Sequence, residues 1–459
     1  MESEWRYGRL DEIVEFLPKR TIKKGSVKPF IAMADIPGNS REPSNISQKE
    51  FEGGGSKFCN GDTVFARITP CLQNGKTAKI SGLIDGQVAH GSTEFIVLGA
   101  KESTDQDYIY YLSRLPEFRC YAESRMEGST GRQRVSWQAL SEYELNFPTK
   151  KERRRIGEFL SILDNKIELN RKTNETLEKM AQALFKSWFV DFDPVIDNAL
   201  EAGNTIPDEL QDRAERRKQQ LAKPDHQPLP DDIRQLFPSE FELTEELGWV
   251  PMGWEEVKSG EVIDVRDGTH DSPQKSEHGF PLVTSRHITS GTLKLEDTYL
   301  ISGEDYAAVN KRSKVETGDI LLTMIGTVGI PYYVLEDPVL FAIKNIGLFR
   351  TSTVPKLASY LYQLLLSPMM QKYLEARMAG TTQKYLSLKV LRNLRMIIPA
   401  DQVLDEFNNI TSALNSKIKG NLESIAALEK LRDTLLPKLI SGELRLPSDA
   451  EQQPAAVNS

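Results

Sequence analysis

The stretch GSTGRQRVSWQALSEYELNFPTKKERRRIGEFLSILDNKIELNRKTNETLEKM (residues 128–180) has a counterpart near the C-terminus. That counterpart reads GTTQKYLSLKVLRNLRMIIPADQVLDEFNNITSALNSKIKGNLESIAALEKL (residues 380–431). A shift of 251 residues superimposes identical residues along the two stretches: Ser136 on Ser387, Leu140 on Leu391, Pro148 on Pro399, Ile167 on Ile418 and Asn170 on Asn421. An ordered series of matches indicates an internal repeat, and a fold predicted without recognising the repeat would be wrong.

Each copy begins with short strand-like segments bounded by Gly, Pro or Asn, such as DTVFARI in the first and DILLTMI in the second. A helical stretch with a proline break follows, and then a Gly/Ser/Thr loop, a strand and one long helix. Each copy is therefore predicted to be a mixed α+β domain of about 150 residues followed by a long helix.

Both long helices repeat apolar residues at alternating spacings of four and three, which is typical of a coiled-coil seam. An amphipathic helix lying on its own domain is the alternative. Two helices of matching length and seam in one chain more naturally pack on each other. The residues predicted to pair the helices are Ile156, Leu163, Ile167, Asn170, Leu177, Leu414, Ile418, Asn421 and Leu428.

Acidic residues concentrate between the two copies. Residues 191–247 carry a net charge of −9, which exceeds the −8 of the whole chain, so the two copies are near neutral to mildly basic. This distribution permits nucleic-acid binding. The predicted parts are a first domain at 1–150, a long helix at 151–193, an acidic Pro-rich linker at 194–246, a second domain at 247–400, a second long helix at 401–446 and a disordered tail at 447–459.

The composition excludes several classes of protein. No apolar run is long enough to span a membrane, and the N-terminus lacks the apolar region of a signal peptide. Three cysteines without a CxxC pair argue against a disulfide framework or a zinc site, so we expect a cytoplasmic protein without a metal. The segment NGKT (74–77) resembles part of a P-loop, but Pro70 stands where the first glycine is required. We expect no catalytic residues.

Polar, Gly-rich loops at matching places in the two copies are the candidate functional sites. They carry Arg, Lys, Asn, Gln, Ser and Thr, the side chains suited to base edges and phosphates. Any one of these residues, taken alone, is more often a solvated loop residue. The loops at 128–134 and 380–385 differ, because both copies carry cationic or amide side chains at this position, and this favours a functional role. The candidates are Arg67, Thr69, Gln73, Asn74, Lys76, His90, Arg132, Gln133 and Arg134 in the first copy, and Thr269, His270, Ser272, Gln274, Lys275, Arg286, Thr323, Lys344, Gln383, Lys384 and Tyr385 in the second.

These features together resemble the specificity subunits of type I restriction–modification systems. The resemblance is carried by LFKSWFVDFDP (184–194) and LLPKLISGELRL (435–446), which close the two long helices, and by DGTH (267–270). It covers nearly the whole chain except the acidic segment and the tail. It implies two target-recognition domains and two conserved helices in a pseudo-twofold arrangement, hence an antiparallel coiled coil.

The resemblance further implies a non-catalytic subunit that binds a bipartite site on double-stranded DNA. It implies assembly with two modification (methyltransferase) subunits, which bring S-adenosylmethionine and methylate adenine, and with restriction subunits that cleave DNA using ATP and Mg²⁺. The chain itself would hold no cofactor. A stand-alone bipartite DNA-binding protein and a coiled-coil scaffold that binds proteins are the alternatives.

Two finer expectations concern the helices. Equivalent residues of a pseudo-twofold antiparallel pair meet at the centre, so we expect Asn170 and Asn421 to approach each other and fix the register. The aromatic residues Phe185, Trp188, Phe189 and Phe192 exceed what a two-helix seam needs. They are expected either to dock a methyltransferase subunit or to pack within the chain.

Overall fold

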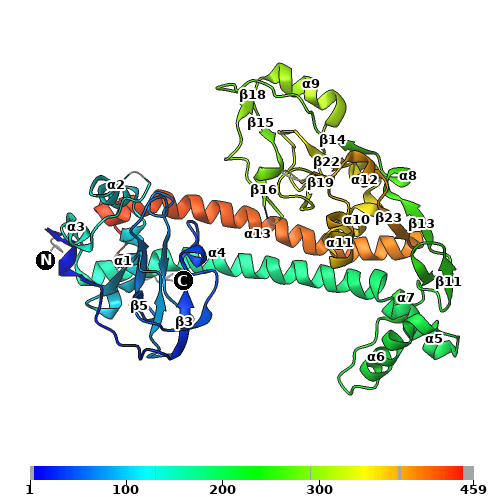
Figure 1. Cartoon of the computed structure of the whole chain (residues 1–459), viewed down its shortest axis with the longest axis horizontal. Helices are drawn as coiled ribbons and strands as arrows, with labels where there is room; N and C mark the ends of the chain where they lie inside the picture. Colours follow the sequence, from blue (N-terminus) through cyan, green and yellow to red (C-terminus); the bar gives the residue numbers. More distant parts are fainter. Residues whose placement is uncertain (1–4, 130, 290, 381–383, 448–459) are drawn as a thin grey trace, which may run out of the picture. The chain divides into compact units, whose positions relative to one another are not determined.

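The computed structural model describes residues 5–129, 131–289, 291–380 and 384–447. The chain divides into two compact units. The first unit holds the described residues up to Lys172 together with those from Leu422 onward, and the second holds Thr173–Asn421. Figure 1 colours the chain by sequence, with the first domain in blue to cyan and the second in green to yellow.

The first unit contains two four-stranded sheets, ordered β2-β9-β6-β7 and β4-β3-β8-β5. Apolar residues of β6 and β9 are buried on both faces, so these strands form the centre of the domain. The strands are β1 (Arg6–Arg9), β2 (Val14–Phe16), β3 (Val27–Ile31), β4 (Ser47–Glu50), β5 (Ser56–Phe58), β6 (Thr63–Ala66), β7 (Thr77–Lys79), β8 (Ala89–Gly91), β9 (Phe95–Ala100) and β10 (Glu144–Phe147). The helices are α1 (Gln106–Ser113), α2 (Pro116–Ser124) and α3 (Trp137–Ser141).

The second unit repeats the central sheet in the order β14-β22-β19-β20, and β13 pairs with β23 as β1 pairs with β10. The strands are β13 (Glu255–Lys258), β14 (Val265–Asp267), β15 (Phe280–Val283), β16 (Ile288–Thr289), β17 (Thr292–Leu293), β18 (Leu300–Ile301), β19 (Ile320–Thr323), β20 (Pro331–Tyr333), β21 (Ala342–Ile343), β22 (Ile346–Phe349) and β23 (Arg395–Ile398). The helices are α8 (Ser259–Val262), α9 (Gly303–Ser313), α10 (Ala358–Leu366), α11 (Pro368–Glu375) and α12 (Leu388–Arg392).

Local signals explain why the same elements form twice. The side chain of Ser136 accepts a hydrogen bond from Ala139 N–H and caps α3, and Ser387 does the same for α12 through Val390 N–H. A proline occupies the first turn of both α2 and α11, where its missing N–H costs nothing. The predicted duplication and the predicted proline breaks are confirmed.

The long helices α4 (Lys150–Phe185) and α13 (Asp401–Ser441) pair antiparallel within the first unit. The Arg171 guanidinium bonds the Glu429 carboxylate at 2.6 Å, while the Arg432 guanidinium bonds Asp164 at 2.7 Å, so the partner number falls as the residue number rises. The predicted seam residues Ile156, Leu163, Ile167 and Asn170 are buried, and Leu428 is half-buried.

Within the second unit the same two helices also pair antiparallel. Asn421 donates its side-chain amide to Asn174 Oδ1 at 2.7 Å, and the Asn174 amide reaches the carbonyl oxygen of Ile418 at 3.4 Å. Here the predicted seam residues Leu177, Leu414 and Ile418 are half-buried.

The predicted pair of seam asparagines has different partners. Asn170 donates to Ser424 Oγ at 3.1 Å, and Asn421 bonds Asn174, which lies one helical turn beyond Asn170. The helix pair therefore matches residues at an offset of about one turn from the alignment of the two sequences. Polar residues do meet at the seam, as predicted, but Asn170 and Asn421 pair with other residues and not with each other.

The aromatic end of α4 forms the core of the second unit. Trp188 is only 1% exposed and packs edge-on to Phe237 at a ring-centroid distance of 5.0 Å, while Phe189 contacts Phe407 at 5.0 Å. The helix widens to a π-helix at Lys186–Val190, which re-aims these rings. Phe185, Trp188, Phe189 and Phe192 therefore pack within the chain, and the expectation that they dock a partner is wrong.

The segment predicted as a linker at 194–246 is folded. It forms α5 (Asp193–Ala202), α6 (Gln211–Leu221), α7 (Asp231–Arg234) and the start of a hairpin of β11 (Phe241–Thr244) and β12 (Gly248–Pro251). Val195, Ile196 and Ala199 are fully buried in the aromatic core of the second unit. The apolar residues spaced along α5 pack into this core, and its acidic residues Asp193 and Asp197 lie against Arg217. Most of the predicted tail at 447–459 lies outside the described residues.

Candidate nucleic-acid interface

Matching isolated β-bridges occur in the two domains, between Glu127 and Arg134 (hairpin 1) and between Ala379 and Tyr385 (hairpin 2). In hairpin 1 the main-chain N–H of Glu127 donates to Arg134 O at 3.0 Å, and the N–H of Arg134 donates to Glu127 O at 2.9 Å. In hairpin 2 the main chains of Ala379 and Tyr385 exchange the same two bonds, both at 2.9 Å. The two loops predicted from the sequence thus share one backbone frame.

Each hairpin is fixed to its central sheet in the same way. Val135 N–H donates to Arg67 O at 3.0 Å in the first domain, and Leu386 N–H donates to Met324 O at 2.9 Å in the second. Arg67 and Met324 are therefore equivalent positions, directly after β6 and β19. The frame is made of main-chain bonds, so the side chains on it can differ between the domains without altering it.

The side chains around hairpin 1 are cationic and mostly exposed. Arg134 binds Glu94 with two parallel hydrogen bonds, Nε to Oε2 at 2.9 Å and a terminal nitrogen to Oε1 at 2.7 Å. The hydrogen bond from Arg134 lowers the pKa of Glu94, so the pair stays ionised. Arg132 is exposed and Gln133 half-buried on the same hairpin.

The loop 69–76 beside hairpin 1 carries the other predicted residues of the first domain. Gln73 and Asn74 are exposed, and Thr69 N–H donates to Gln133 O at 3.1 Å, which joins the loop to the hairpin. Lys76 is tethered, because its ammonium donates to the carbonyl oxygen of Met33 at 2.9 Å. The structure brings Arg67, Thr69 and hairpin 1 together and leaves Lys76 with a structural partner.

Two predicted residues are not available to a ligand. His90 is 5% exposed and lies between the rings of Phe30 and Phe51, at centroid distances of 5.0 and 5.2 Å. Thr323 is 0% exposed on β19, and its hydroxyl accepts a hydrogen bond from Ile330 N–H at 2.9 Å. Both predictions are wrong, because these polar groups serve the core.

In the second domain the DGTH segment builds a compact polar site around the buried carboxylate of Asp267. Arg312 donates to Asp267 Oδ1 at 2.5 Å, and His270 Nε2 lies 3.1 Å from Oδ2. The other ring nitrogen of His270 bonds Asn345 Oδ1 at 2.7 Å. The ring of His270 is therefore held at both ends while its face stays exposed.

The glycine of DGTH is required by close packing. A Cβ on Gly268 would lie 2.5 Å from Ile343 O and 2.9 Å from Lys344 N, both main-chain atoms that cannot give way. Thr269 Oγ1 accepts a hydrogen bond from Asp271 N–H at 3.1 Å, which turns the chain after it. Each of the four residues of the segment 267–270 therefore has its own structural role.

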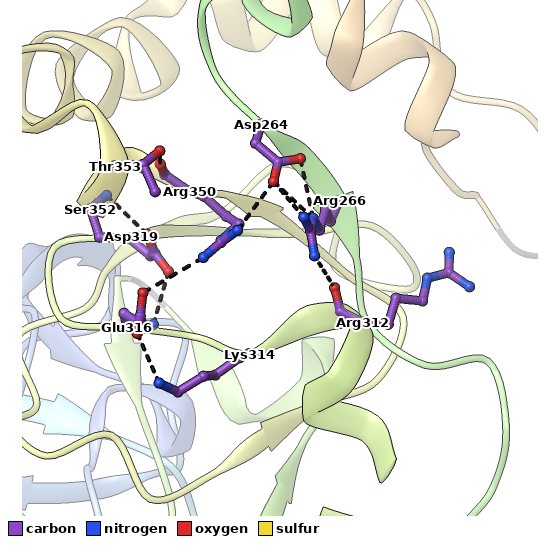
Figure 2. A network of polar contacts seen from close by, with 9 residues as sticks. All are labelled: Asp264, Arg266, Arg312, Lys314, Glu316, Asp319, Arg350, Ser352 and Thr353. Carbon is purple, nitrogen blue, oxygen red and sulfur yellow. Dashed lines mark hydrogen bonds and ion pairs between the residues drawn. The ribbon is translucent and has the colours of Figure 1, made fainter. Parts of the chain in front are cut away.

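A polar network built on Asp264 and Arg266, just before Asp267 in the sequence, contacts the end of α9 (Figure 2). Arg266 donates to the main-chain oxygen of Arg312 at 2.8 Å and binds Asp264, which also contacts Arg350. In Figure 2 the Arg312 side chain extends away from these groups. The network holds the end of α9 so that the Arg312 guanidinium reaches Asp267.

Several of the remaining predicted residues of the second domain each contact a different partner. Lys344 bonds Ser272 Oγ, and Lys275 lies over the ring of Tyr299 at 5.8 Å. Arg286 Nε donates to His287 Nε2 at 2.9 Å, and burial, with the Arg286 charge, lowers the pKa of His287. The exposed residues among these predicted residues are Ser272, Gln274, Lys275, Arg286, Lys384 and Tyr385. Gln383 lies outside the described residues.

Sequence reasoning missed Glu94, Arg312 and Asn345. Glu94 and Asn345 are equivalent positions just before β9 and β22, and each holds a neighbouring predicted residue. Asn345 has a left-handed φ of 53°, a conformation that asparagine tolerates better than most residues. No periodicity marks these positions, although the repeat alignment could have paired them.

Among the described residues, no group of three or more His, Cys, Asp or Glu side chains could hold a metal ion. The described helices include none both long and apolar enough to cross a membrane.

Comparisons with known proteins agree with this architecture. A family profile described as the type I restriction modification DNA specificity domain matches residues 2–179 and 251–424. The type I restriction enzyme HindI specificity subunit of Haemophilus influenzae is 26% identical over 96% of this chain and 100% of its own length. The MjaIX specificity subunit of Methanocaldococcus jannaschii is 26% identical over 75% of this chain and 71% of its own.

A solved structure shows the same fold. The type I restriction–modification S subunit from M. genitalium matches with a TM-score of 0.52 and 14% identity, over 95% of this chain and 96% of that one. Since the family profile matches both copies of the repeat and most of the chain, this protein belongs to the type I restriction–modification DNA specificity family.

Proposed function

We propose that this chain is the specificity subunit of a type I restriction–modification complex and that each domain reads one half of a bipartite DNA target. It directs adenine methylation and DNA cleavage that partner subunits carry out, and no bond-breaking step is assigned to its own residues. Family membership supports the role of specificity subunit. The geometry of the two hairpins supports the division of labour between the domains.

The observation that carries this proposal is one backbone frame bearing two different sets of side chains. Arg134 of hairpin 1 and Tyr385 of hairpin 2 occupy equivalent positions, as do Gln133 and Lys384. Arg134 is held by Glu94, whereas Tyr385 is exposed. Glutamine pairs with adenine, whereas lysine makes other contacts. Two readers with the same frame and different side chains suit a target whose halves differ in sequence.

The partners follow from the family and are part of the proposal. Two modification subunits would bring S-adenosylmethionine, and restriction subunits would use ATP and Mg²⁺. The chain would work in the cytoplasm, where the DNA of its host lies. Mapping methylated adenines in host DNA with and without this gene tests the proposal directly. We expect a two-part motif with a fixed spacer that disappears when the gene is deleted.

Hairpin variants assign the halves. Replacing Gln133 with Ala is expected to relax the motif in one half, and replacing Tyr385 with Ala is expected to relax only the other half. A continuous motif, or a motif that both substitutions alter in the same half, would contradict the division of labour. Co-purification with a methyltransferase separates a complex subunit from a stand-alone DNA-binding protein.

A further inference from the structure

A second concave site lies beside hairpin 1 in the first domain. The cavity has a volume of about 320 Å³ and opens to solvent. It lies where β2 and β6 end and β9 begins. We call it the Arg67 pocket, and it is lined by Leu17, Pro18, Gly55, Ser56, Lys57, Arg67, Thr93, Phe95 and Val97.

A run of three glycines ends at the Arg67 pocket, and its last member, Gly55, lines the pocket, where a Cβ would lie 2.5 Å from Gly91 O. Gly53, Gly54 and Gly55 all have left-handed φ angles, of 112°, 73° and 73°. A Cβ on Gly53 or Gly54 would meet nothing within 4 Å, so packing does not explain these glycines. Within the described residues the N–H groups of Gly53 and Gly54 donate no hydrogen bond. Such loops expose main-chain donors that suit anions.

Arg67 is the second cationic group of the pocket besides Lys57. Its Nε is buried and has no hydrogen-bond partner among the described residues. Its main chain is fixed on both sides, because Arg67 N–H donates to Glu94 O at 3.0 Å and Arg67 O accepts from Val135 N–H. A buried donor without a partner is costly unless a ligand supplies the acceptor.

Leu17 is one of the apolar residues that line the pocket. It has a left-handed φ of 51° and is 42% exposed, although a leucine is strained in that conformation and gains little from exposure. Pro18 lines the pocket beside it. The lining of the pocket therefore combines apolar side chains with the two cations Lys57 and Arg67.

The second domain lacks this arrangement, which gives an internal comparison. Met324 replaces Arg67, as the matched bonds from Val135 and Leu386 show. With Gly61-Asp62 aligned on Gly318-Asp319, the glycine run falls on residues 310–312, which form the last turns of α9. Lys314, the counterpart of Lys57, binds Glu316 at 2.8 Å. Of the two cations of the pocket, one is replaced by a methionine and the other is paired with a carboxylate in the second domain.

We infer that the Arg67 pocket binds the sugar–phosphate backbone of one DNA strand next to hairpin 1. A phosphate accepts hydrogen bonds from Arg67 and Lys57, and the apolar lining residues Leu17 and Pro18 contact the deoxyribose. This inference rests on the proposed function as a DNA-binding subunit. It assigns the first domain a sequence-independent grip that the second domain does not have.

A backbone contact and a base contact predict different binding data. A cation on a phosphate contributes equally to all sequences, and its loss reduces the slope of log K against log salt by about 0.9. A cation that reads guanine contributes only to the cognate site. Fluorescence anisotropy of the full chain, or of its complex, with cognate and scrambled duplexes over a range of salt concentrations separates the two.

The test variants are Arg67→Met, which installs the residue of the second domain, and Lys57→Met. Lys314→Met is the matched control, because it removes the equivalent cation of the second domain. Thermal melts check that each variant folds. We expect Arg67→Met and Lys57→Met to weaken binding to the cognate and the scrambled duplex by the same factor, between about three- and tenfold. The slope of log K against log salt should also become shallower. Lys314→Met should leave both unchanged.

The outcomes are distinct. A loss confined to the cognate duplex, or to duplexes with an intact first half, would show that Arg67 reads a base and would overturn the inference. Unchanged binding in both folded variants would show that the pocket is not occupied. Inhibition of the wild type by millimolar inorganic phosphate that Arg67→Met no longer shows would support a phosphate site. No DNA binding by the wild-type complex would instead refute the proposed function.

Discussion

The buried ion pair between Asp164 and Arg432 gives the most direct test of how the first unit is held together. The Asp164 side chain is 6% exposed and that of Arg432 is 12% exposed. One carboxylate oxygen accepts from Arg432 at 2.7 Å, and the other accepts from the Tyr111 hydroxyl at 2.7 Å. Asp164 thus joins α13, α4 and α1. We expect Asp164→Ala to open this junction.

The magnitude follows from what the substitution leaves behind. Two hydrogen bonds to a charged group are lost, each worth about 1.5–3 kcal/mol. The Arg432 guanidinium and the Tyr111 hydroxyl then remain buried without this acceptor. Removing one partner of a buried pair costs about 3–5 kcal/mol. We therefore expect the free energy of local opening around residue 164 to fall by about 3–5 kcal/mol.

Hydrogen exchange measured by mass spectrometry suits this test, because a chain of two units need not unfold in one step. Peptides covering 156–170 and 425–440 report on the junction. Arg171→Ala is the matched control, since its pair with Glu429 lies on the same helices but is about 30% exposed. A half-exposed pair of this kind contributes about 0–1 kcal/mol.

A double variant separates the charge from the packing. Asp164→Leu combined with Arg432→Met removes both charges and fills most of the space, so it should recover more than half of the loss. The unpaired Tyr111 hydroxyl accounts for the remainder. The reasoning is refuted if Asp164→Ala changes exchange no more than Arg171→Ala does, or if the double variant opens as readily as the single one.

Three further substitutions test other parts of the structure. Trp188→Ala empties a fully packed site and should destabilise the second unit by about 3–5 kcal/mol in a thermal or urea melt, a result that an unchanged midpoint would contradict. Asn421→Ala leaves Asn174 Oδ1 without its hydrogen-bond donor and should lower the free energy of unfolding by about 1–3 kcal/mol. In a double-mutant cycle with Asn174→Ala, the two losses should be coupled rather than additive. Gly268→Ala places a Cβ within 2.5 Å of Ile343 O, so it should abolish recognition of one half-site and spare the other. Gly420→Ala is the control, because a Cβ there meets nothing within 4 Å. This control should leave the stability unchanged or raise it by up to about 1 kcal/mol.

The sequence predicted the architecture well, because its strongest signals are local and repeated. The serines at 136 and 387 cap matching helices, and the 4-3 spacing of apolar residues placed the seam of α4. The partner of each seam asparagine could not be predicted, since the offset between two paired helices depends on the packing of whole domains and not on spacing within one helix.

The candidate site was predicted less well for a physical reason. A polar side chain can serve a ligand or the protein itself, and only burial and partners separate the two roles. His90 and Thr323 are polar residues in Gly-rich surroundings, yet both satisfy hydrogen bonds inside the domain. Arg67 has the opposite character, with a buried nitrogen that the described chain leaves unpaired.

Composition misled the reading of residues 194–246 in a related way. Fifteen acidic residues between 191 and 247 suggested a solvated linker. The apolar face of α5 is short. It packs on aromatic residues just before the segment and on apolar residues of the second domain, which lie outside residues 194–246. A window confined to the segment could not reveal that contact.

The main-chain bonds that frame hairpins 1 and 2 bear on how such a protein changes over generations. Because these bonds involve no side chain, a single codon change at residue 385 can replace an exposed side chain and leave the main-chain frame intact. One half of the target could then drift while the other is retained, so new restriction specificities would arise stepwise from a common ancestor.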